Sequence, residues 1–225
     1  MARPSNTEAR RAQITRALVK VMAKRGYDGA SVADIAKTAR LTPGLVHYHF
    51  KNKREVLLAA LDDLVLRHDA QLEVRLTRAG GDPILDVASF IDFHLGLGAD
   101  ADPEVLACWI LLSGEALREP KVRVAFEKAL GAAVARLSEV IRRGVEQRVF
   151  ACEAADAAAS ALVAAIQGYF VLAATARKII PKGSAAVSTK RMAEGLLRPS
   201  RPFTSKEARS RVTLRALPKG NVVHV

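Results

Sequence analysis

The sequence predicts an all-α protein in which a small basic head precedes a larger, nearly neutral helical body. Half of the 225 residues are hydrophobic but only 5% are aromatic, a balance that favours helices over a β-sandwich or barrel. Apolar residues recur every three or four positions, which is the spacing of amphipathic helices. Residues 1–53 carry eleven Lys or Arg against three Asp or Glu, a net charge of +8, whereas residues 54–197 carry −2. A basic head on a neutral body indicates a polyanion-binding module.

The head is expected to contain three helices and the start of a fourth. Gly26 ends the first helix. Ser31 and Thr42 are suited to cap the second and third, because a hydroxyl oxygen can accept a hydrogen bond from a free N–H in the first turn. Pro43 fits the first position of the third helix, where no N–H is needed. The expected helices of this part are 7–25, 31–38, 42–48 and 53–77.

The body is expected to add five helices after a Gly-Gly-Asp-Pro break at residues 80–83. Residues 157–176 carry no charge and are long enough to span a bilayer, but their alanine, hydroxyl and amide content favours a helix buried in protein. Residues 199–225 are basic and lack apolar periodicity, so a disordered tail is expected. The expected helices are 84–97, 103–117, 120–148, 154–179 and 185–197, and the expected domains are 1–53, 54–198 and 199–225.

The second and third helices of the head have the spacing of a helix-turn-helix motif, because about three residues join them. In such a motif the first helix braces against the DNA backbone and the second enters the major groove. Small side chains are needed where the two helices cross, and Ala36 and Ala39 meet that need. The motif and its charge predict that the head binds double-stranded DNA.

These residues also carry a family resemblance. Residues 31–36 read SVADIA, and residues 41–53 read LTPGLVHYHFKNK. Residues 47–58 resemble the YxHFxxKxxLL signature of the DNA-binding domain of TetR-type bacterial transcriptional regulators. The resemblance implies an operator-binding head and a helical body that binds a small molecule and forms a homodimer. Residues 114–120, GEALREP, resemble the choline-sensing branch of these regulators.

Two positions depart from the family pattern. Many relatives have glycine where this chain has Arg40; if that position requires a positive φ, the side chain costs about 1 kcal/mol. Many relatives also have tyrosine in place of His47, which affects the base preference rather than the fold. The apolar Val46 and Phe50 are expected in the core beneath the motif.

A set of residues in and around the motif is predicted to contact DNA. His47 and His49 form an HxH pair without a third metal ligand nearby, so DNA contact is favoured over metal binding. Lys53 lies at a helix N-terminus, where a cation is unfavourable; the resemblance implies a phosphate as its partner. For Tyr48, packing and a phosphate contact both remain open. The predicted residues are Arg10, Arg11, Ser31, Thr42, Pro43, Gly44, Leu45, His47, Tyr48, His49 and Lys53.

The body contains no catalytic motif such as a phosphate-binding glycine loop, HExxH or GxSxG. No enzymatic activity, cofactor or metal site is therefore expected, and Cys108 is interpreted as a core residue. One group of side chains either packs as plain core or lines an apolar effector pocket between helices, with His94, Ser113 and Gln167 as its polar members. That group is Phe90, Phe93, His94, Trp109, Ser113, Gln167, Tyr169 and Phe170.

The alanine-rich segment 154–179 has an apolar surface that a second chain could cover, together with the helices 120–148 and 185–197. We therefore expect a homodimeric, cytoplasmic transcriptional regulator, most simply a repressor that a small-molecule effector releases from its operator; no export signal and no membrane association are expected. The alternatives are a helical-bundle enzyme or carrier with an incidental basic terminus, and a non-specific DNA-compacting protein.

Overall fold

The computed structural model describes residues 6–96 and 103–203. Within these ranges the chain is helical and contains no strand, as predicted. The helices are α1 (Asn6–Arg25), α2 (Val32–Ala39), α3 (Pro43–His49), α4 (Lys53–Ala79), α5 (Pro83–Leu95), α6 (Pro103–Ala116), α7 (Pro120–Glu146), α8 (Ala155–Thr175), the 3-10 turn η1 (Arg177–Ile179) and α9 (Ser184–Leu197).

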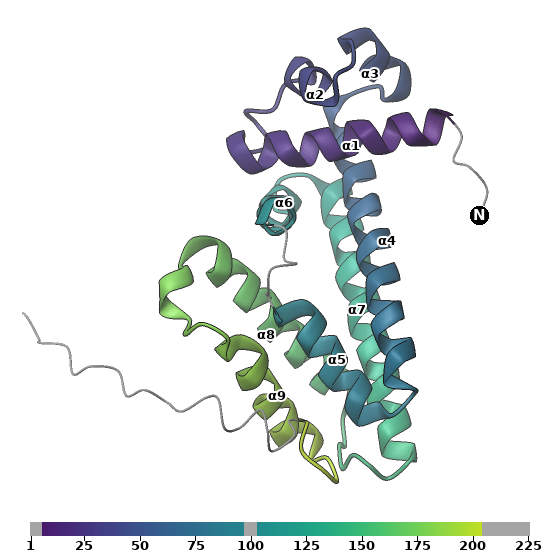
Figure 1. Ribbon diagram of the computed structural model, residues 1–225, viewed down its shortest axis with the longest axis vertical. Helices are drawn as coiled ribbons and strands as arrows, with labels where there is room; N and C mark the ends of the chain where they lie inside the picture. Colours follow the sequence, from purple (N-terminus) through teal and green to yellow (C-terminus); the bar gives the residue numbers. More distant parts are fainter. Residues whose placement is uncertain (1–5, 97–102, 204–225) are drawn as a thin grey trace, which may run out of the picture.

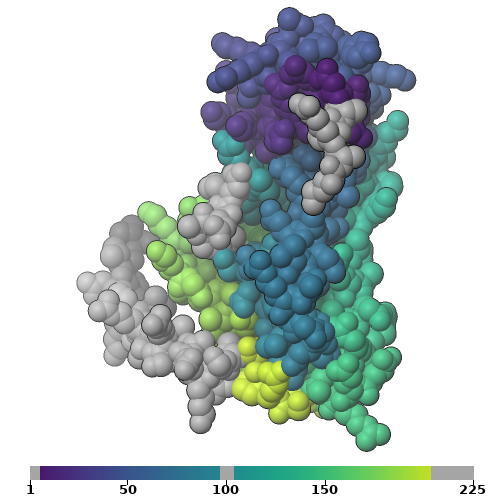
Figure 2. All heavy atoms as spheres, turned by 45° about the vertical axis from the view of Figure 1, so that its right-hand side comes forward, coloured from purple at the N-terminus to yellow at the C-terminus, as the bar shows by residue number. Residues whose placement is uncertain are grey.

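The head sits at one end of an elongated molecule. α1, α2 and α3 form a compact unit, and α1 lies across the upper ends of α4 and α7 (Figure 1). α4 leaves the head and runs down the body beside α7, with which it makes contact. The space-filling view shows the continuous surface that α4 forms below the head (Figure 2). α5, α8 and α9 pack together on the other side of this pair. One long helix therefore belongs to both the head and the body.

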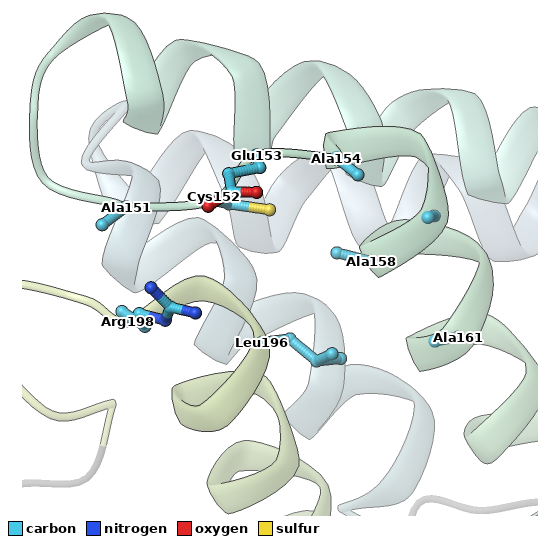
Figure 3. Close-up of a pocket in the computed structure, with 9 residues that line it drawn as sticks. Ala151, Cys152, Glu153, Ala154, Ala158, Ala161, Leu196 and Arg198 are labelled. Carbon is cyan, nitrogen blue, oxygen red and sulfur yellow. The ribbon is translucent and has the colours of Figure 1, made fainter.

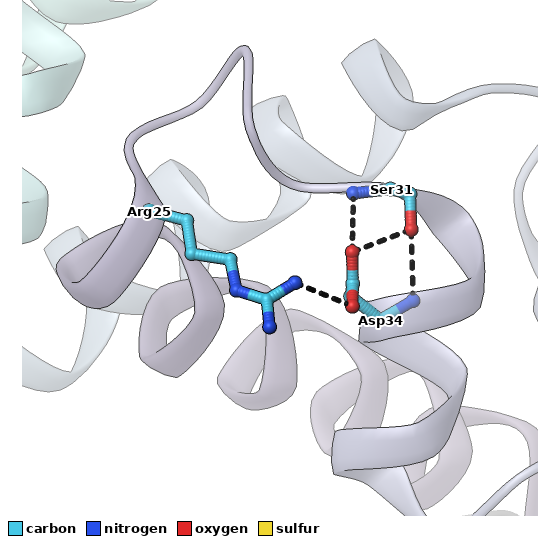
Figure 4. Close-up of polar contacts among 3 residues, drawn as sticks. All are labelled: Arg25, Ser31 and Asp34. Carbon is cyan, nitrogen blue, oxygen red and sulfur yellow. Dashed lines mark hydrogen bonds and ion pairs between the residues drawn. The ribbon is translucent and has the colours of Figure 1, made fainter.

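Local capping explains where the helices of the head begin. The Ser31 hydroxyl accepts a hydrogen bond from the N–H of Asp34 at 3.0 Å, and the Asp34 carboxylate accepts from the N–H of Ser31 at 3.2 Å (Figure 4). This reciprocal pair is a capping box, and Arg25 at the end of α1 is ion-paired with the same carboxylate. Thr42 caps α3 as predicted, because its hydroxyl accepts from the N–H of Leu45.

The turn between α2 and α3 adopts the conformation that Arg40 was expected to resist. Arg40 has φ 55° and ψ 44°, in the left-handed region. The N–H of Leu41 donates to the carbonyl of Ala36 at 2.9 Å, and that of Arg40 to the carbonyl of Lys37 at 3.1 Å. This is the pattern of a Schellman motif, in which glycine is the usual left-handed residue. The condition under which the Arg40 side chain was expected to cost about 1 kcal/mol is therefore met.

The buried residues of the head do not stop at residue 53. Its hydrophobic core continues along α4 to Leu64 and includes Cys108 and Leu112 of α6, both fully buried. Two ion pairs link the same parts: Arg54 with Glu119 at 2.7 Å, and Arg118 with Asp28 at 3.5 Å. The proposed boundary after residue 53 thus falls at the start of a helix that both parts share.

Two sequence expectations need correction in the body. α8 ends at Thr175 rather than near residue 179, because the backbone turns at Ala176 and η1 follows. The first residues after α9 pack on the body: Phe203 is buried and its ring lies 6.1 Å from that of Phe150, while Arg201 is ion-paired with Asp82. The predicted disordered tail therefore does not begin at residue 199, and its remainder lies outside the described residues.

Candidate DNA interface and effector site

The third helix of the head, α3, presents one face to the core and another to solvent. Val46 and Phe50 are 1% and 2% exposed, as predicted for core residues. Tyr48 is 80% exposed and His47 is also exposed. The half-buried ring of His49 packs edge-on against Tyr48, with 5.1 Å between ring centroids. A large aromatic ring held in water on a helix is available to a partner.

The predicted DNA-contacting residues fall into two groups by exposure. Ser31 is exposed, but its hydroxyl is already engaged with Asp34. Leu45 is half-buried between the surface and the core. The exposed members are Arg11, Ser31, Thr42, Pro43, Gly44, His47 and Tyr48, and the half-buried members are Arg10, Leu45, His49 and Lys53.

Lys53 has an intramolecular partner that the sequence did not reveal. Its Nζ donates to the backbone carbonyl of Tyr27 at 2.8 Å and lies 4.2 Å from the centre of the Tyr27 ring. A carbonyl and a ring face both attract a cation, so this contact offsets the unfavourable position of the amine at the start of α4. The predicted contact between Lys53 and a phosphate remains a proposal. In a complex with DNA, the phosphate would compete with the Tyr27 carbonyl for the Lys53 amine.

The two arginines at the start of α1 also bond within the head. Arg10 donates to the side-chain oxygen of Gln13 at 2.8 Å, and Arg11 donates to the carbonyl of His49 at 2.6 Å. The sequence left two interpretations of both arginines: ordinary solvated charges, or contacts to DNA where the first helix would meet its backbone. Exposed cations that it omitted, Arg40 and Lys51, flank α3 on either side. The basic composition of the segment around the motif could have identified these two residues as candidate DNA contacts.

In the body, three of the other predicted pocket residues lie around His94. Its ring centroid lies 4.3 Å from that of Phe90, 5.3 Å from Phe93 and 6.4 Å from Phe170. His68 of α4, which was not predicted, completes this aromatic cluster at 4.7 Å from His94. Leu64 and Leu72, one turn to either side of His68, are both buried, so an ionisable residue on the apolar stripe of α4 was the available signal.

Burial controls the charge of this cluster. It lowers the pKa of His94 to about 4, and the neighbouring His68 adds to the effect. Burial also lowers the pKa of His68, with Asp69 at 3.8 Å opposing the shift. The Nδ1 of His94 lies 2.7 Å from the carbonyl of Phe90. Both rings are therefore neutral near pH 7.

A second group links α6 to α8. The indole N–H of Trp109 donates to the side-chain oxygen of Gln167 at 2.8 Å, and the Trp109 ring lies 4.7 Å from that of Phe126. Gln167 is three residues from Phe170 on α8, so the two groups are neighbours. The Ser113 hydroxyl instead donates to the carbonyl of Ile110 on its own helix at 2.7 Å. Tyr169 is partly buried against the core of the body.

Two open hollows lie at the far end of the body, away from the predicted pocket. One, of about 410 Å³, is lined by alanines of α8, by Cys152 and by Leu196 of α9 (Figure 3). The other, of about 580 Å³, adjoins it near Arg142 and Asp156. Both hollows are open to solvent, and Arg142 and Asp156 are already ion-paired with each other at 2.6 Å, so neither hollow is assigned as an effector site.

One face of α8 packs on the body and the opposite face is open. Leu162 and Ile166 are buried, whereas Ala161, Ala164 and Gly168 are exposed. By length and composition α8 could cross a membrane, but a third of its most apolar window is buried in the protein. This partial burial agrees with a helix that packs on its own chain along one face and leaves the other face to a partner, as the sequence predicted.

The described residues offer no group of three or more metal-ligating side chains. Cys108 is fully buried, which raises the pKa of its thiol to about 12. A thiol that stays protonated is a poor nucleophile, and the interpretation of Cys108 as a core residue is confirmed.

The comparisons with known proteins match both parts of the chain. Residues 14–60 match the model of bacterial regulatory proteins of the tetR family, and residues 88–198 match the C-terminal model of BetI-type transcriptional repressors. The regulator BetI of Rhizobium meliloti is 32% identical over 117 residues, which span 51% of this chain and 55% of BetI. The regulator TtgR of Pseudomonas putida is 28% identical over 180 residues, 78% of this chain and 70% of TtgR.

Solved structures share the fold. A regulator from Haloarcula marismortui superimposes with a TM-score of 0.77 at 20% identity, over 84% of this chain and 99% of its own. A regulator from Saccharomonospora viridis in complex with choline gives a TM-score of 0.71 at 24% identity, over 84% and 95%. With a tetR-type head and a BetI-type C-terminal region in one chain, this protein belongs to the TetR family of bacterial regulatory proteins.

Proposed function

We propose that this protein is a DNA-binding transcriptional repressor that a small organic effector releases from its operator. The observation that carries the proposal is α3, which is capped by Thr42, anchored by Val46 and Phe50, and turns His47 and Tyr48 to solvent in a basic head. This is the geometry that places side chains against base edges in the major groove. Such a regulator acts on DNA in the cytoplasm.

The DNA proposal is tested by selecting bound fragments from genomic DNA and measuring their affinity against excess bulk DNA. A regulator keeps a selected fragment at a ratio of about 10³ or more, whereas a compacting protein keeps none. His47→Ala is expected to relax the preference at particular bases by about 1–3 kcal/mol. Lys51→Ala, which removes an exposed cation outside α3, should weaken all sequences about equally. Equal behaviour of the two variants would contradict the assignment of α3 as the reading helix.

We infer that a second copy of the chain covers the open face of α8. Ala161, Ala164 and Gly168 allow another helix to approach closely, and the exposed Met192 and Leu196 of α9 extend the apolar surface. α7 is less suited to this role, because its exposed positions include the charged Arg123, Lys128 and Glu139. A dimer would present two heads to successive major grooves about 34–36 Å apart.

Oligomer size in solution tests the interface. Ala161→Arg should convert the dimer to monomers, since a buried unpaired charge is costly. Ala132→Arg, at an exposed alanine of α7, is the matched control and should leave the dimer intact. The reverse result would move the interface from α8 to α7.

The aromatic cluster around His94 and the Trp109–Gln167 pair support an effector site between α4, α5, α6 and α8. Ring faces attract quaternary ammonium groups, and choline is bound in the similar structure from Saccharomonospora viridis. Choline is therefore the first effector to test. Trp109 is the only tryptophan, so its fluorescence reports binding directly, and release of a selected DNA fragment reports the response. No change in either signal up to millimolar choline would exclude it.

The cluster also supports a route from effector to DNA. His68 lies on α4, in ring contact with Phe93 and His94 of α5, and the same helix starts in the head. An effector that binds better to one position of α4 would shift the population of head positions.

A further inference from the structure

The start of α1 closes the ends of both helices of the helix-turn-helix motif. The Gln13 side-chain amide donates to the carbonyl of Ala39, the last residue of α2, at 2.6 Å. Arg11 Nη1 donates to the carbonyl of His49, the last residue of α3, at 2.6 Å. The last four carbonyls of a helix have no partner within it. Two neighbouring residues of α1 thus satisfy the terminal carbonyl of each motif helix.

Each of these contacts is itself supported. The Arg11 guanidinium lies 4.1 Å over the centre of the buried Phe50 ring, so a cation–π contact adds to the hydrogen bond. A cation is also favourable at the C-terminus of a helix. Arg10 donates to the Gln13 oxygen at 2.8 Å, which orients the amide so that its nitrogen faces Ala39.

We propose that Arg11 and Gln13 are positioning residues that fix the angle of α3 against DNA, and that Arg11 acts through α3 rather than by contacting phosphate. The proposal rests on the function proposed above. α3 has only seven residues, and Val46 is its one buried member, so its core anchors alone resist rotation poorly. A recognition surface needs its side chains held within about 0.5 Å and 10–20°. The hydrogen bond from Arg11 to the His49 carbonyl holds the end of α3 in place. It thereby constrains the direction of the exposed His47 and Tyr48 side chains on the same helix.

The two possible roles of Arg11 predict different measurements. A phosphate contact releases counterions, so its loss weakens binding to every sequence and reduces the salt slope by about 0.9 per contact. A positioning residue changes the fit of α3 to bases. Its loss lowers the affinity for the selected operator, while bulk-DNA affinity and the salt slope stay the same.

The experiment uses the full chain and measures Kd for a selected operator and for bulk DNA over a series of salt concentrations. The variants are Arg11→Ala, Arg11→Lys and Gln13→Ala, with Arg16→Ala as a control at an exposed arginine of α1. Arg11→Ala and Gln13→Ala should each lower the operator-to-bulk ratio by about tenfold, with an unchanged salt slope. Arg11→Lys should recover part of the ratio, since its amine can reach the same carbonyl. Arg16→Ala should leave the ratio unchanged.

Gln13 carries no charge, so a loss of ratio in Gln13→Ala cannot come from the loss of a cation that neutralises a phosphate. Thermal unfolding followed by circular dichroism checks that each variant is folded. The proposal is overturned if Arg11→Ala weakens operator and bulk DNA equally with a smaller salt slope, or if neither Arg11→Ala nor Gln13→Ala changes the ratio. If the unmodified protein prefers no sequence, the proposed function itself fails, which the same measurement separates from a failure of this inference.

Discussion

The head and the body assemble their functional surfaces over very different distances along the chain. In the head, Ser31 and Thr42 cap helices that begin at the next residue. The exposed face of α3 is likewise formed by residues that are close together in the sequence. In the body, the ring of His94 meets partners from α4, α5 and α8. The contrast teaches that local hydrogen bonds define where the helices of the proposed DNA-binding surface begin, whereas tertiary packing alone brings together the rings of the proposed effector site. The two surfaces should therefore respond differently to substitution.

The largest expected effect tests whether the head is separate from the body at all. Leu112→Ala, on α6 of the body but in the core of the head, should cost about 2–5 kcal/mol of unfolding free energy. It should also weaken DNA binding, because α6 packs against α1. Leu162→Ala, equally buried in the other core, should cost a similar amount without changing the affinity of the folded protein for DNA. Urea unfolding and DNA binding measure the two effects.

If Leu112→Ala leaves DNA affinity unchanged, the head is an independent unit and the shared core is not functional.

The next prediction concerns the pH dependence of stability, in which the buried His94 of the body should differ from the exposed His47 of the head. The pKa of His94 is about 4 in the folded state against 6.5 for an unperturbed ring, so the unfolded chain binds a proton that the folded protein does not. The contribution of neutral His94 to the free energy of unfolding is fully present above pH 6.5 and is lost as the pH falls towards 4. Between pH 7 and pH 5 this amounts to about 2 kcal/mol. His94→Phe should remove that part of the slope in urea unfolding.

His47→Phe, at an exposed position of α3, is the control in the head and should retain the slope of the unmodified protein. An identical pH profile for His94→Phe and the unmodified protein would show that His94 does not carry this dependence.

The smallest effect compares one backbone motif in both regions. Arg40 and Arg148 both have left-handed φ values, 55° and 57°. Each ends its helix with the paired bonds of a Schellman motif. Arg40→Gly and Arg148→Gly should each raise the unfolding free energy by about 0.5–1 kcal/mol. Only Arg40→Gly changes the charge beside α3, so a loss of DNA affinity confined to that variant would add Arg40 to the interface.

Much of the head could be predicted because its signals are neighbours in sequence. The caps of α2 and α3 and the burial of Val46 and Phe50 follow from residue types and helical periodicity. The partner of Lys53 could not be predicted, since the Tyr27 carbonyl lies 26 residues away. A backbone carbonyl carries no sequence signal, and its availability depends on how the chain turns before α2.

In the body, the sequence identified the aromatic residues of the candidate pocket but not which of their rings lie in contact. The predicted polar groups have partners that composition does not reveal: Gln167 bonds with Trp109, and Ser113 bonds with its own helix. The start of the tail was placed too early because Phe203, a single apolar residue in a basic segment, offers no periodicity. Its burial against Phe150 depends on the path of the chain after α9.

The length of α4 sets a mechanical scale for regulation. Its 27 residues form a rod of about 40 Å, and His68 lies about 22 Å from its head end. A rotation of about 5° around His68 displaces the head end by about 2 Å over that arm. In the proposed homodimer, opposite rotations would change the distance between the two heads by about 4 Å, which exceeds the spacing of about 3.4 Å between successive base pairs. A rotation of α4 by about 5° would thus be enough to move the two α3 helices of the proposed homodimer out of register with their half-sites.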